Sequence, residues 1–535
     1  MPSFTHWLKN AQLKLGLALL LIALIGIPLV PHYGLSVDEG TEIAMVRRNI
    51  EFVTQGKPIP GDLKYFGTFF NVIAEGVFQA QAFVKSGFSL KNLNYTAQLN
   101  TEADRLAALR ARVDVKHYVT FLFSGLTYLA VAGLVAIFCG WEWAWLGVLG
   151  LALMPIHWGH SFFNPKDPPF AAMFTLASWA GAHFLAHCLE YPHQNRRTFL
   201  YSILYGALLG FTSGVRIGGA AILGFIALTY VGLAWPGKRR FIWIYGILVA
   251  VWFGVHALCY PAFWANPVAG FWETYSYLSS HPLQITVLFW GLDIPIQEIP
   301  ALYLPTWVWL SIPGIFHLGF WGGSVFLLRQ WGSLSVVQRA GLLLLWWQVL
   351  FLPGLAIARS SPLYDGMRHF LFITPAIVVV TVVAGIKVWQ ALGRHRFRLF
   401  FLGLVIVACG GIIVDMITLH PYQYIYINRL AGGIAGAHQR FDLEVLGLSL
   451  REGMEWLNQN AAPNSTVVVG GLLNSARLYA APQLQVNDLK TRPIEPFYYL
   501  SWLRWQDHKR YLNCPIVHQV TRQGVPLAIV RYCSN

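Results

Sequence analysis

The chain has 535 residues, of which 56% are hydrophobic and only 12% are charged, and its mean hydropathy is +0.50. A soluble domain usually has about 25% charged residues, so the composition excludes an ordinary soluble protein and indicates a polytopic membrane protein. The net charge is +14, but much of the basic charge lies in short clusters between apolar segments. That distribution is typical of membrane topology and not of nucleic-acid binding.

Apolar segments long enough to cross a bilayer follow one another along the chain. The first covers residues 15–30, and Pro31 and Tyr33 follow it in place of the small residues of a signal cleavage site. A long polar stretch, residues 31–116, comes next. The later spans are predicted at residues 117–140, 143–162, 169–190, 198–214, 217–235, 241–260, 303–328, 340–358, 369–391 and 398–419. The total is about eleven spans of about 20 residues each.

The basic clusters between these spans fix an orientation. If the N-terminus, with Lys9 and Lys14, is cytoplasmic, every basic cluster between spans falls on the cytoplasmic side. The outer side then holds the first loop (31–116), the loop around Asp167, residues 261–302, residues 359–368 and the C-terminal segment.

Two adjacent carboxylates, Asp38 and Glu39, follow the first span within nine residues. Such a pair is partly desolvated and self-repelling, which raises one pKa unless cations are near. Two interpretations are open: a solvated acidic loop at the membrane edge, or an acid/base pair in a site.

Beyond this pair, apolar residues at helical spacing predict an interfacial helix from residue 41 to 53, and an aromatic-rich second helix at 63–84. These helices either cap the bundle or form the wall of a site that contains Lys64, Tyr65 and Glu75.

Three further outer segments carry basic residues against the charge bias. His160, Asn164, Lys166 and Asp167 follow the third span, and Arg216 lies between two spans with glycines on both sides. A third loop adds Tyr364, Asp365, Arg368 and His369. Basic side chains at the lipid boundary are costly unless they are paired. Their convergence on one face predicts an anion site with an acid or base beside it; the alternative is separate snorkelling residues and helix ends.

These features resemble the GT-C glycosyltransferases, in the branch of the protein O-mannosyltransferases and lipid A aminoarabinose transferases. The resemblance rests on Asp38-Glu39 after the first span, the loop with two amphipathic helices, and the acidic loop at residues 164–167. Residues 364–370 and 420–424 are similar to bacterial lipid-carrier-dependent glycosyltransferases. The resemblance covers residues 1–420, the expected catalytic domain. It implies inverting transfer of a sugar from a polyprenyl-phosphate carrier to a lipid, glycan or protein acceptor, outside a bacterial inner membrane.

The resemblance also assigns roles. An inverting transfer needs a base for the acceptor proton, and Asp38 matches the first acidic position of the family. Lys166, Arg216 and Arg368 are candidates to hold the leaving phosphate, with Lys64 and Tyr65 as further phosphate ligands. Glu39 and Asp167 complete the catalytic set by orienting these cations or binding sugar hydroxyls. Further candidates are Glu75, His160, Asn164, Tyr364, Asp365 and His369.

We expect no required cofactor and no metal-ligand cluster, with a divalent cation as the alternative. A transporter or lipid flippase is the rival function, because it would also have many spans and outer cations. Transporters often have inverted repeats and charges near the midplane, and the sequence shows neither pattern.

Residues 421–535 are predicted to form a small extracytoplasmic α/β domain. Residues 511–520 and 525–532 are predicted as two strands, with Gln523-Gly524 as a two-residue turn. Antiparallel pairing about that turn places Cys514 opposite Cys533, at a separation that a disulfide can bridge. The alternative is two reduced cysteines in a hairpin whose register is shifted by a bulge.

Overall fold

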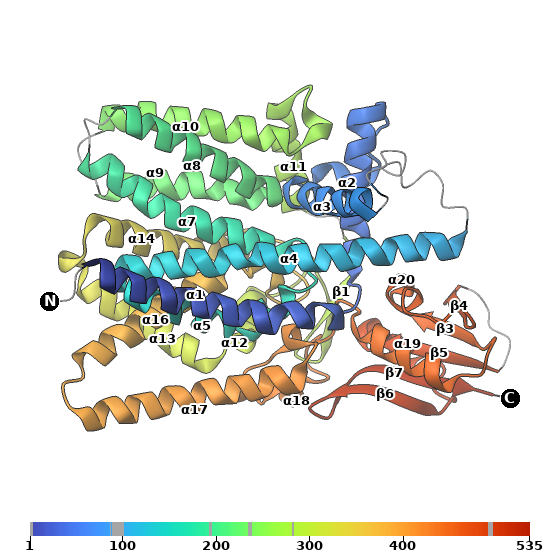
Figure 1. Ribbon diagram of the computed structural model, residues 1–535. Helices are drawn as coiled ribbons and strands as arrows, with labels where there is room; N and C mark the ends of the chain where they lie inside the picture. Colours follow the sequence, from blue (N-terminus) through green and yellow to red (C-terminus); the bar gives the residue numbers. More distant parts are fainter. Residues whose placement is uncertain are drawn as a thin grey trace.

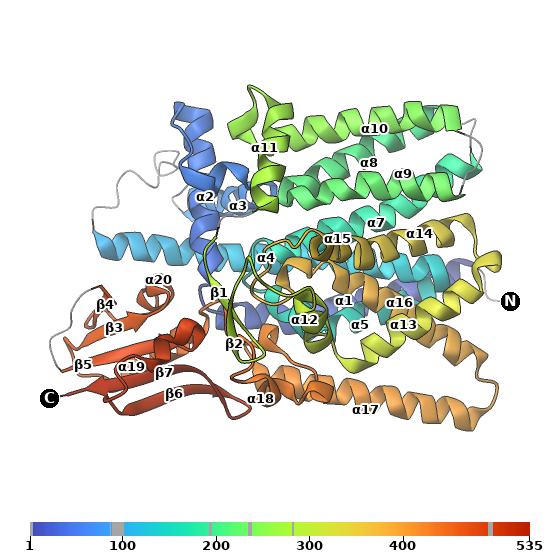
Figure 2. The same cartoon turned by 180° about the vertical axis from the view of Figure 1, so that it is seen from behind.

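Long apolar helices run side by side and a β-sheet domain lies at one end of them, as seen in the computed structural model (Figure 1). The structure describes residues 4–85, 87, 101–191, 195–233, 238–280, 283–490 and 496–534. Helices α10 (Lys238–Leu258) and α17 (His395–Leu419) begin with basic residues, and both begin on the side of the bundle opposite the sheet domain (Figures 1 and 2).

Seven helices in the described part of the chain are long and apolar enough to cross a membrane. An eighth span results if α12 (Tyr303–Ser311) and α13 (Gly314–Arg329), which are bent by 110°, are one broken span. The protein is therefore an integral membrane protein, and the predicted count of about eleven spans is not confirmed. The seven are α1 (Phe4–Leu29), α4 (Glu102–Cys139), α8 (Asn195–Val215), α10, α14 (Val336–Trp346) continued by α15 (Leu352–Ala358), α16 (Ile373–Ala391) and α17.

The remaining predicted spans are also helical, but they are not among the seven helices that are long and apolar enough to cross a membrane. Residues 143–162 form α5 (Ala144–Ala152) and α6 (Pro155–His160), because Pro155 cannot continue the first helix. Residues 217–233 form a short 3₁₀ turn and α9 (Ala221–Leu233). The central helix α7 (Asp167–Glu190) is mostly buried and includes polar contacts, such as the Ser178 hydroxyl donating to Gln348 at 2.9 Å.

Two helices at the sheet end of the bundle match the predicted amphipathic helices. α2 (Val37–Gln55) contains the first one and begins four residues before the predicted start. The second is shorter than predicted: residues 61–65 form a 3₁₀ turn, η2, and α3 covers Phe69–Lys85. The outer loop after α10 forms α11 (Pro267–Ser279) and a hairpin of β1 (Thr286–Phe289) and β2 (Leu292–Pro295), which the sequence did not predict.

The C-terminal domain contains a mixed five-stranded sheet with strand order β4-β3-β5-β7-β6. Its strands are β3 (Thr466–Gly470), β4 (Gln485–Asp488), β5 (Phe497–Trp502), β6 (Ile516–Arg522) and β7 (Val525–Cys533), with helices α19 (Ser449–Asn460) and α20 (Leu473–Arg477). Its apolar core begins at Leu450, whereas buried residues between 422 and 448, including α18 (Gly433–Ala437), share the core of the helical part. The segment from 421 to 448 is therefore the connection that fixes the sheet domain to the bundle.

The last two strands have the predicted turn and a register that shifts twice. Gln523 and Gly524 both have positive φ, and Arg522 pairs with Val525 around them. The register shifts by one residue between Val520 and Thr521 and shifts back between Ile516 and His518. Because the two shifts cancel, Cys514 and Cys533 face each other, with Cα atoms 4.9 Å apart, and a disulfide joins them.

Candidate active site

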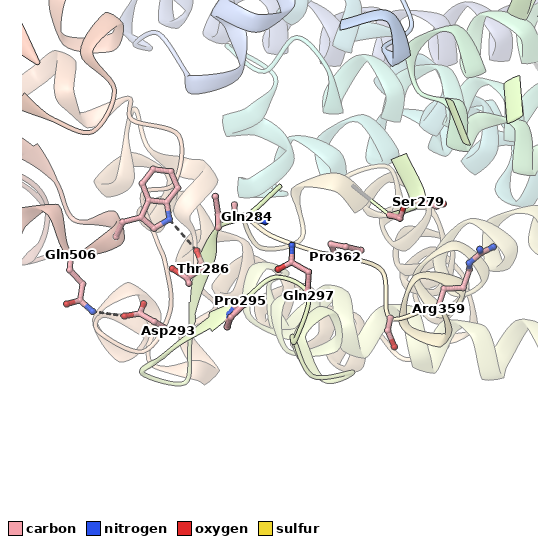
Figure 3. A pocket seen from close by; sticks show the side chains of 13 residues that line it. Ser279, Gln284, Thr286, Asp293, Pro295, Gln297, Arg359, Pro362 and Gln506 are labelled. Carbon is pink, nitrogen blue, oxygen red and sulfur yellow. Dashed lines mark hydrogen bonds between the residues drawn. The ribbon is translucent and has the colours of Figure 1, made fainter. Parts of the chain in front are cut away.

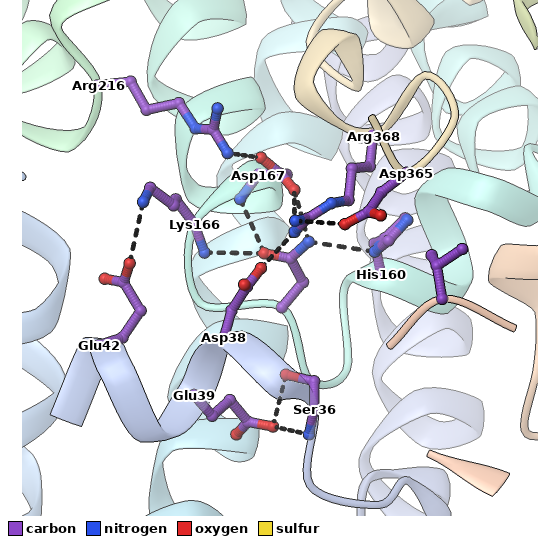
Figure 4. A network of polar contacts seen from close by, with 12 residues as sticks. Ser36, Asp38, Glu39, Glu42, His160, Lys166, Asp167, Arg216, Asp365 and Arg368 are labelled. Carbon is purple, nitrogen blue, oxygen red and sulfur yellow. Dashed lines mark hydrogen bonds and ion pairs between the residues drawn. The ribbon is translucent and has the colours of Figure 1, made fainter. Parts of the chain in front are cut away.

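The start of α2 fixes the position of Asp38. Ser36 precedes the helix, and its backbone N–H and hydroxyl both donate to one oxygen of Glu39, at 2.8 and 3.0 Å. His117 Nε2 donates to the other oxygen of Glu39 at 2.9 Å. The Glu39 carboxylate is fully buried by these contacts, and it turns away from Asp38 (Figure 4). Glu39 therefore caps the helix, and the prediction that it acts in catalysis is replaced by a positioning role.

The start of α7 supplies the second carboxylate. Asn164 Oδ1 accepts the backbone N–H groups of Lys166 and Asp167, both at 3.0 Å, and Asn164 Nδ2 donates to the Asp167 carboxylate at 2.7 Å. The same Nδ2 is 3.2 Å from Nδ1 of His160, which is buried behind the loop. Asn164 therefore folds the turn that directs Lys166 and Asp167 toward α2.

Two arginines from distant segments meet these carboxylates (Figure 4). Arg216, after α8, donates to Asp167. Arg368, in the 3₁₀ turn η9 (Arg368–Phe370), donates to Asp38; it also lies 2.8 Å from Asp365 and 3.8 Å from Asp167. The side chain of Arg368 is 5% exposed, so these contacts are shielded from water. One guanidinium thus joins three carboxylates from three parts of the chain.

The C-terminal domain contributes one further cation. Arg504, in the 3₁₀ turn η12 (Arg504–Lys509) after β5, donates to Asp365 at 2.5 Å and to the backbone carbonyl of Val445 at 2.9 Å. Its side chain is 4% exposed. The sheet domain is thereby linked through Asp365 to Arg368.

The site has equal numbers of acidic and basic side chains. We call the set the charge cluster: its carboxylates belong to Asp38, Glu42, Asp167 and Asp365, and its cations to Lys166, Arg216, Arg368 and Arg504. Within it, Lys166 Nζ lies 3.1 Å from Glu42. Burial raises the pKa of the Asp38 carboxyl, but the charges of Arg368 and Lys166 outweigh burial and hold that pKa below its ordinary value. Asp38 is therefore ionised at neutral pH.

The cluster retains donors that could bind an anion. The Nε–H groups of Arg216 and Arg368 are buried and have no hydrogen-bond partner within the described part of the chain. A buried unpaired donor is costly, and the Nε–H of Arg504 in the same cluster is also buried without a partner among the described residues.

A cavity of about 600 Å³ opens over the cluster. Asp38, Lys166, Arg216 and Arg368 line it on one side, whereas Asp167 lies behind them with 1% of its side chain exposed. Another part of the wall is apolar and comes from the 3₁₀ turn η5 (Ile217–Ala220), from α15 and from the residue before α16, including Ile217, Leu352, Leu355, Ala356 and Phe372. The cavity thus combines a charged end with an apolar flank.

The structure brings together the central group of predicted site residues. Asp38, Lys166, Arg216, Asp365 and Arg368 all line the cavity. Tyr364 and His369 line it too, with ring centroids 4.7 Å apart, and burial raises the pKa of Tyr364 to about 12, so its hydroxyl stays protonated.

Other predicted residues have different contacts. Lys64 and Tyr65 both bond to Glu273 of α11, at 2.8 and 2.7 Å, and only Tyr65 also lines the cavity. Glu75 pairs with Arg112 of α4 at 3.1 Å. Lys64 and Glu75 thus join helices, and the prediction that they belong to the site is not supported by their contacts.

Two members of the charge cluster were not among the predicted residues. Glu42 lies four residues after Asp38, and the i,i+4 spacing on the predicted helix is a signal that would have identified it. Arg504 has no such signal, because it lies in an irregular turn of another domain.

Comparison with solved structures shows the fold. A search of protein families and of curated proteins with this sequence finds no match. Among solved structures, the archaeal oligosaccharyltransferase AglB from Archaeoglobus fulgidus, in complex with an inhibitory peptide and a dolichol-phosphate, is similar with a TM-score of 0.51 and 12% identity. The match covers 89% of this chain and 64% of AglB.

ArnT from Cupriavidus metallidurans, bound to undecaprenyl phosphate, matches with a TM-score of 0.46 and 12% identity over 99% of this chain and 98% of ArnT. The likeness to AglB shows that this chain shares the fold of that protein.

Proposed function

We propose that the protein is a membrane glycosyltransferase that moves a sugar from a polyprenyl-phosphate carrier to an acceptor hydroxyl, with inversion at the anomeric carbon. The observation that carries the proposal is the charge cluster at the mouth of a cavity with an apolar flank. The solved structure of AglB is a complex with a dolichol-phosphate, and that of ArnT has undecaprenyl phosphate bound.

Asp38 acts as the base in this proposal. It is ionised, its side chain is 29% exposed, and it lines the cavity, so it can reach an acceptor that enters there. The acceptor oxygen bonds to the anomeric carbon while its proton passes to the Asp38 carboxylate, and the bond from that carbon to the phosphate oxygen breaks. The products are the glycosylated acceptor and the free polyprenyl phosphate.

The leaving phosphate gains one negative charge in this step, and positively charged groups that contact it stabilise the transition state. Lys166, Arg216 and Arg368 line the cavity, and each charge-assisted hydrogen bond contributes about 1.5–3 kcal/mol. Asp167 touches Arg216 and Arg368 from behind and acts as a positioning residue.

The polyprenyl tail would lie along the apolar flank formed by Ile217, Leu352 and Leu355. This placement requires the charge cluster at the membrane surface, and we propose that this surface is extracytoplasmic, in a bacterial inner membrane. Three side-chain cations supply the positive charge, so we propose that no metal cofactor is needed. Turnover that stops in EDTA and returns with Mg²⁺ or Mn²⁺ would contradict that part of the proposal.

The test uses the purified full-length protein in lipid nanodiscs and polyprenyl-phosphate sugars with a radiolabel in the sugar. We expect at least one donor to lose its label to an acceptor from a membrane extract or to water, with free polyprenyl phosphate as the second product. A flippase would instead move the donor across a vesicle membrane without cleaving it. Movement of intact donor, with no cleavage of any donor offered, would overturn the glycosyltransferase proposal.

A further inference from the structure

A second, larger cavity of about 1320 Å³ adjoins the catalytic one. Its walls come from the end of α11, the β1–β2 hairpin, the loop after α15 and the η12 turn of the sheet domain (Figure 3). Ser279, Ile285, Arg359, Pro362 and Trp505 line both cavities. The two cavities therefore meet at these five residues.

The side chains of this cavity are mostly polar and uncharged. They include serines, a threonine and glutamines, which both donate and accept hydrogen bonds, and only two charged residues, Asp293 and Arg359, of opposite sign. An anionic or cationic ligand would find no excess of opposite charge here. Four of these side chains already donate a hydrogen bond within the protein, and their oxygen atoms remain as acceptors for ligand hydroxyl groups; they belong to Ser279, Ser280, Gln297 and Gln506. The polar lining residues are Ser279, Ser280, Gln284, Thr286, Gln297, Ser360 and Gln506.

Trp505 supplies an aromatic surface where the two cavities meet. The Arg504 guanidinium lies 4.6 Å from the centre of its ring, and its indole N–H donates to the Thr286 carbonyl at 3.3 Å. These contacts hold the ring in place while 44% of the residue stays exposed. A fixed aromatic ring beside hydroxyl-binding groups is suited to the apolar C–H face of a pyranose.

The η12 turn contributes side chains to both cavities and contains residues in an unfavourable backbone conformation. Trp505 and Gln506 both have positive φ, 52° and 58°, which non-glycine residues rarely adopt. The turn directs Arg504 to Asp365 of the charge cluster and directs Gln506 to Asp293 of the hairpin, at 2.5 Å. Backbone strain of this kind persists where surrounding contacts enforce it, and it often marks a functional site.

We infer that the second cavity binds the acceptor and that the acceptor is a saccharide, with Trp505 as its stacking surface. This inference rests on the proposed function, since it names the acceptor class for that reaction. The sheet domain then has two tasks: Arg504 supports the charge cluster, and Trp505 and Gln506 select the acceptor.

The test is binding of the full-length protein in nanodiscs to a glycan microarray and, in parallel, to an array of serine- and threonine-containing peptides. We expect retention on a set of saccharides, weakened at least tenfold by Trp505→Ala. Gln284→Trp, which fills the cavity from the hairpin side, should have the same effect without touching the η12 turn. The control is Trp290→Ala on the same hairpin, which removes a 53% exposed tryptophan that does not line the cavity and should leave binding unchanged.

Thermal unfolding shows whether each variant is folded. Three results would each overturn the inference: retention on peptides alone, no retention on any saccharide, or saccharide binding that survives in both Trp505→Ala and Gln284→Trp. Binding of undecaprenyl phosphate is measured on the same samples. In the wild-type protein, absence of saccharide binding with lipid binding intact refutes only the acceptor site, whereas absent lipid binding counts against the proposed function.

Discussion

Replacing Arg504 by Gln tests whether the sheet domain takes part in the reaction. The change removes the guanidinium that bridges Asp365 and the Val445 carbonyl, at 2.5 and 2.9 Å. Asp365, whose side chain is 3% exposed, then pairs with Arg368 alone among the described residues. Arg368 is drawn toward Asp365 and away from Asp38, so both the base and the phosphate site lose their geometry.

The expected magnitude follows from these contacts. Hydrogen bonds to charged groups contribute about 1.5–3 kcal/mol each, and removing one partner of a buried ion pair costs about 3–5 kcal/mol. Glutamine keeps one of the two contacts at most, so we expect a loss near 3 kcal/mol. At about 1.4 kcal/mol for each tenfold change in rate, kcat/KM should fall by up to roughly 100-fold, and the part of the loss that falls on folding should lower Tm.

The assay measures cleavage of a labelled polyprenyl-phosphate sugar by Arg504→Gln, by Asp365→Asn and by the double variant. Because both single changes break one interaction, the double variant should be hardly worse than either single one. The matched control is Arg510→Gln in the same segment, where the arginine is 57% exposed and pairs with Asp507. Activity of Arg504→Gln within twofold of the control, or strictly additive effects in the cycle, would refute the link between the domain and the site.

Three further predictions concern the charge cluster and the helix cap beside it. Replacing any one of the cavity-lining cations Lys166, Arg216 and Arg368 by Ala should weaken binding of undecaprenyl phosphate and slow turnover together. Normal binding and turnover in all three variants would place the anion site elsewhere. Glu39→Ala should lower the free energy of unfolding by about 1–2 kcal/mol through loss of the helix cap, seen as a lower Tm, while kcat of the folded protein falls far less than on loss of Asp38. Cations hold the pKa of Asp38 below its ordinary value near 4, so the carboxylate stays ionised above that pH. The value of kcat/KM should therefore stay level from pH 7 to about pH 5. A fall in kcat/KM with a midpoint above pH 5 would argue against Asp38 as the base.

Much of the charge cluster could be predicted because membrane topology constrains where span ends lie. Lys166, Arg216 and Arg368 follow different spans, but the parity of the spans places all three at one face, next to Asp38. The structure brings them together around one cavity. The span count was harder to predict, since hydropathy does not reveal that Pro155 breaks one segment or that α12 and α13 are bent by 110°.

The misassigned residues have local causes. Ser36 and Glu39 have the spacing of a capping box, a signal that would have separated Glu39 from its neighbour Asp38. Arg504 could not be predicted, because its position depends on a turn with two consecutive positive-φ residues and on the docking of one domain against another.

In the proposed reaction Asp38 takes the acceptor proton, at a site that binds a polyprenyl phosphate. The most direct test compares Asp38→Asn with the wild-type protein in sugar transfer from a labelled donor, with undecaprenyl phosphate binding and Tm measured on the same samples. Glu51→Gln, on the same helix but paired with Arg48, is the control. We predict that Asp38→Asn is folded, binds the lipid and transfers no sugar above background, and that the control is unaffected. Turnover by Asp38→Asn close to that of the wild type would contradict the account.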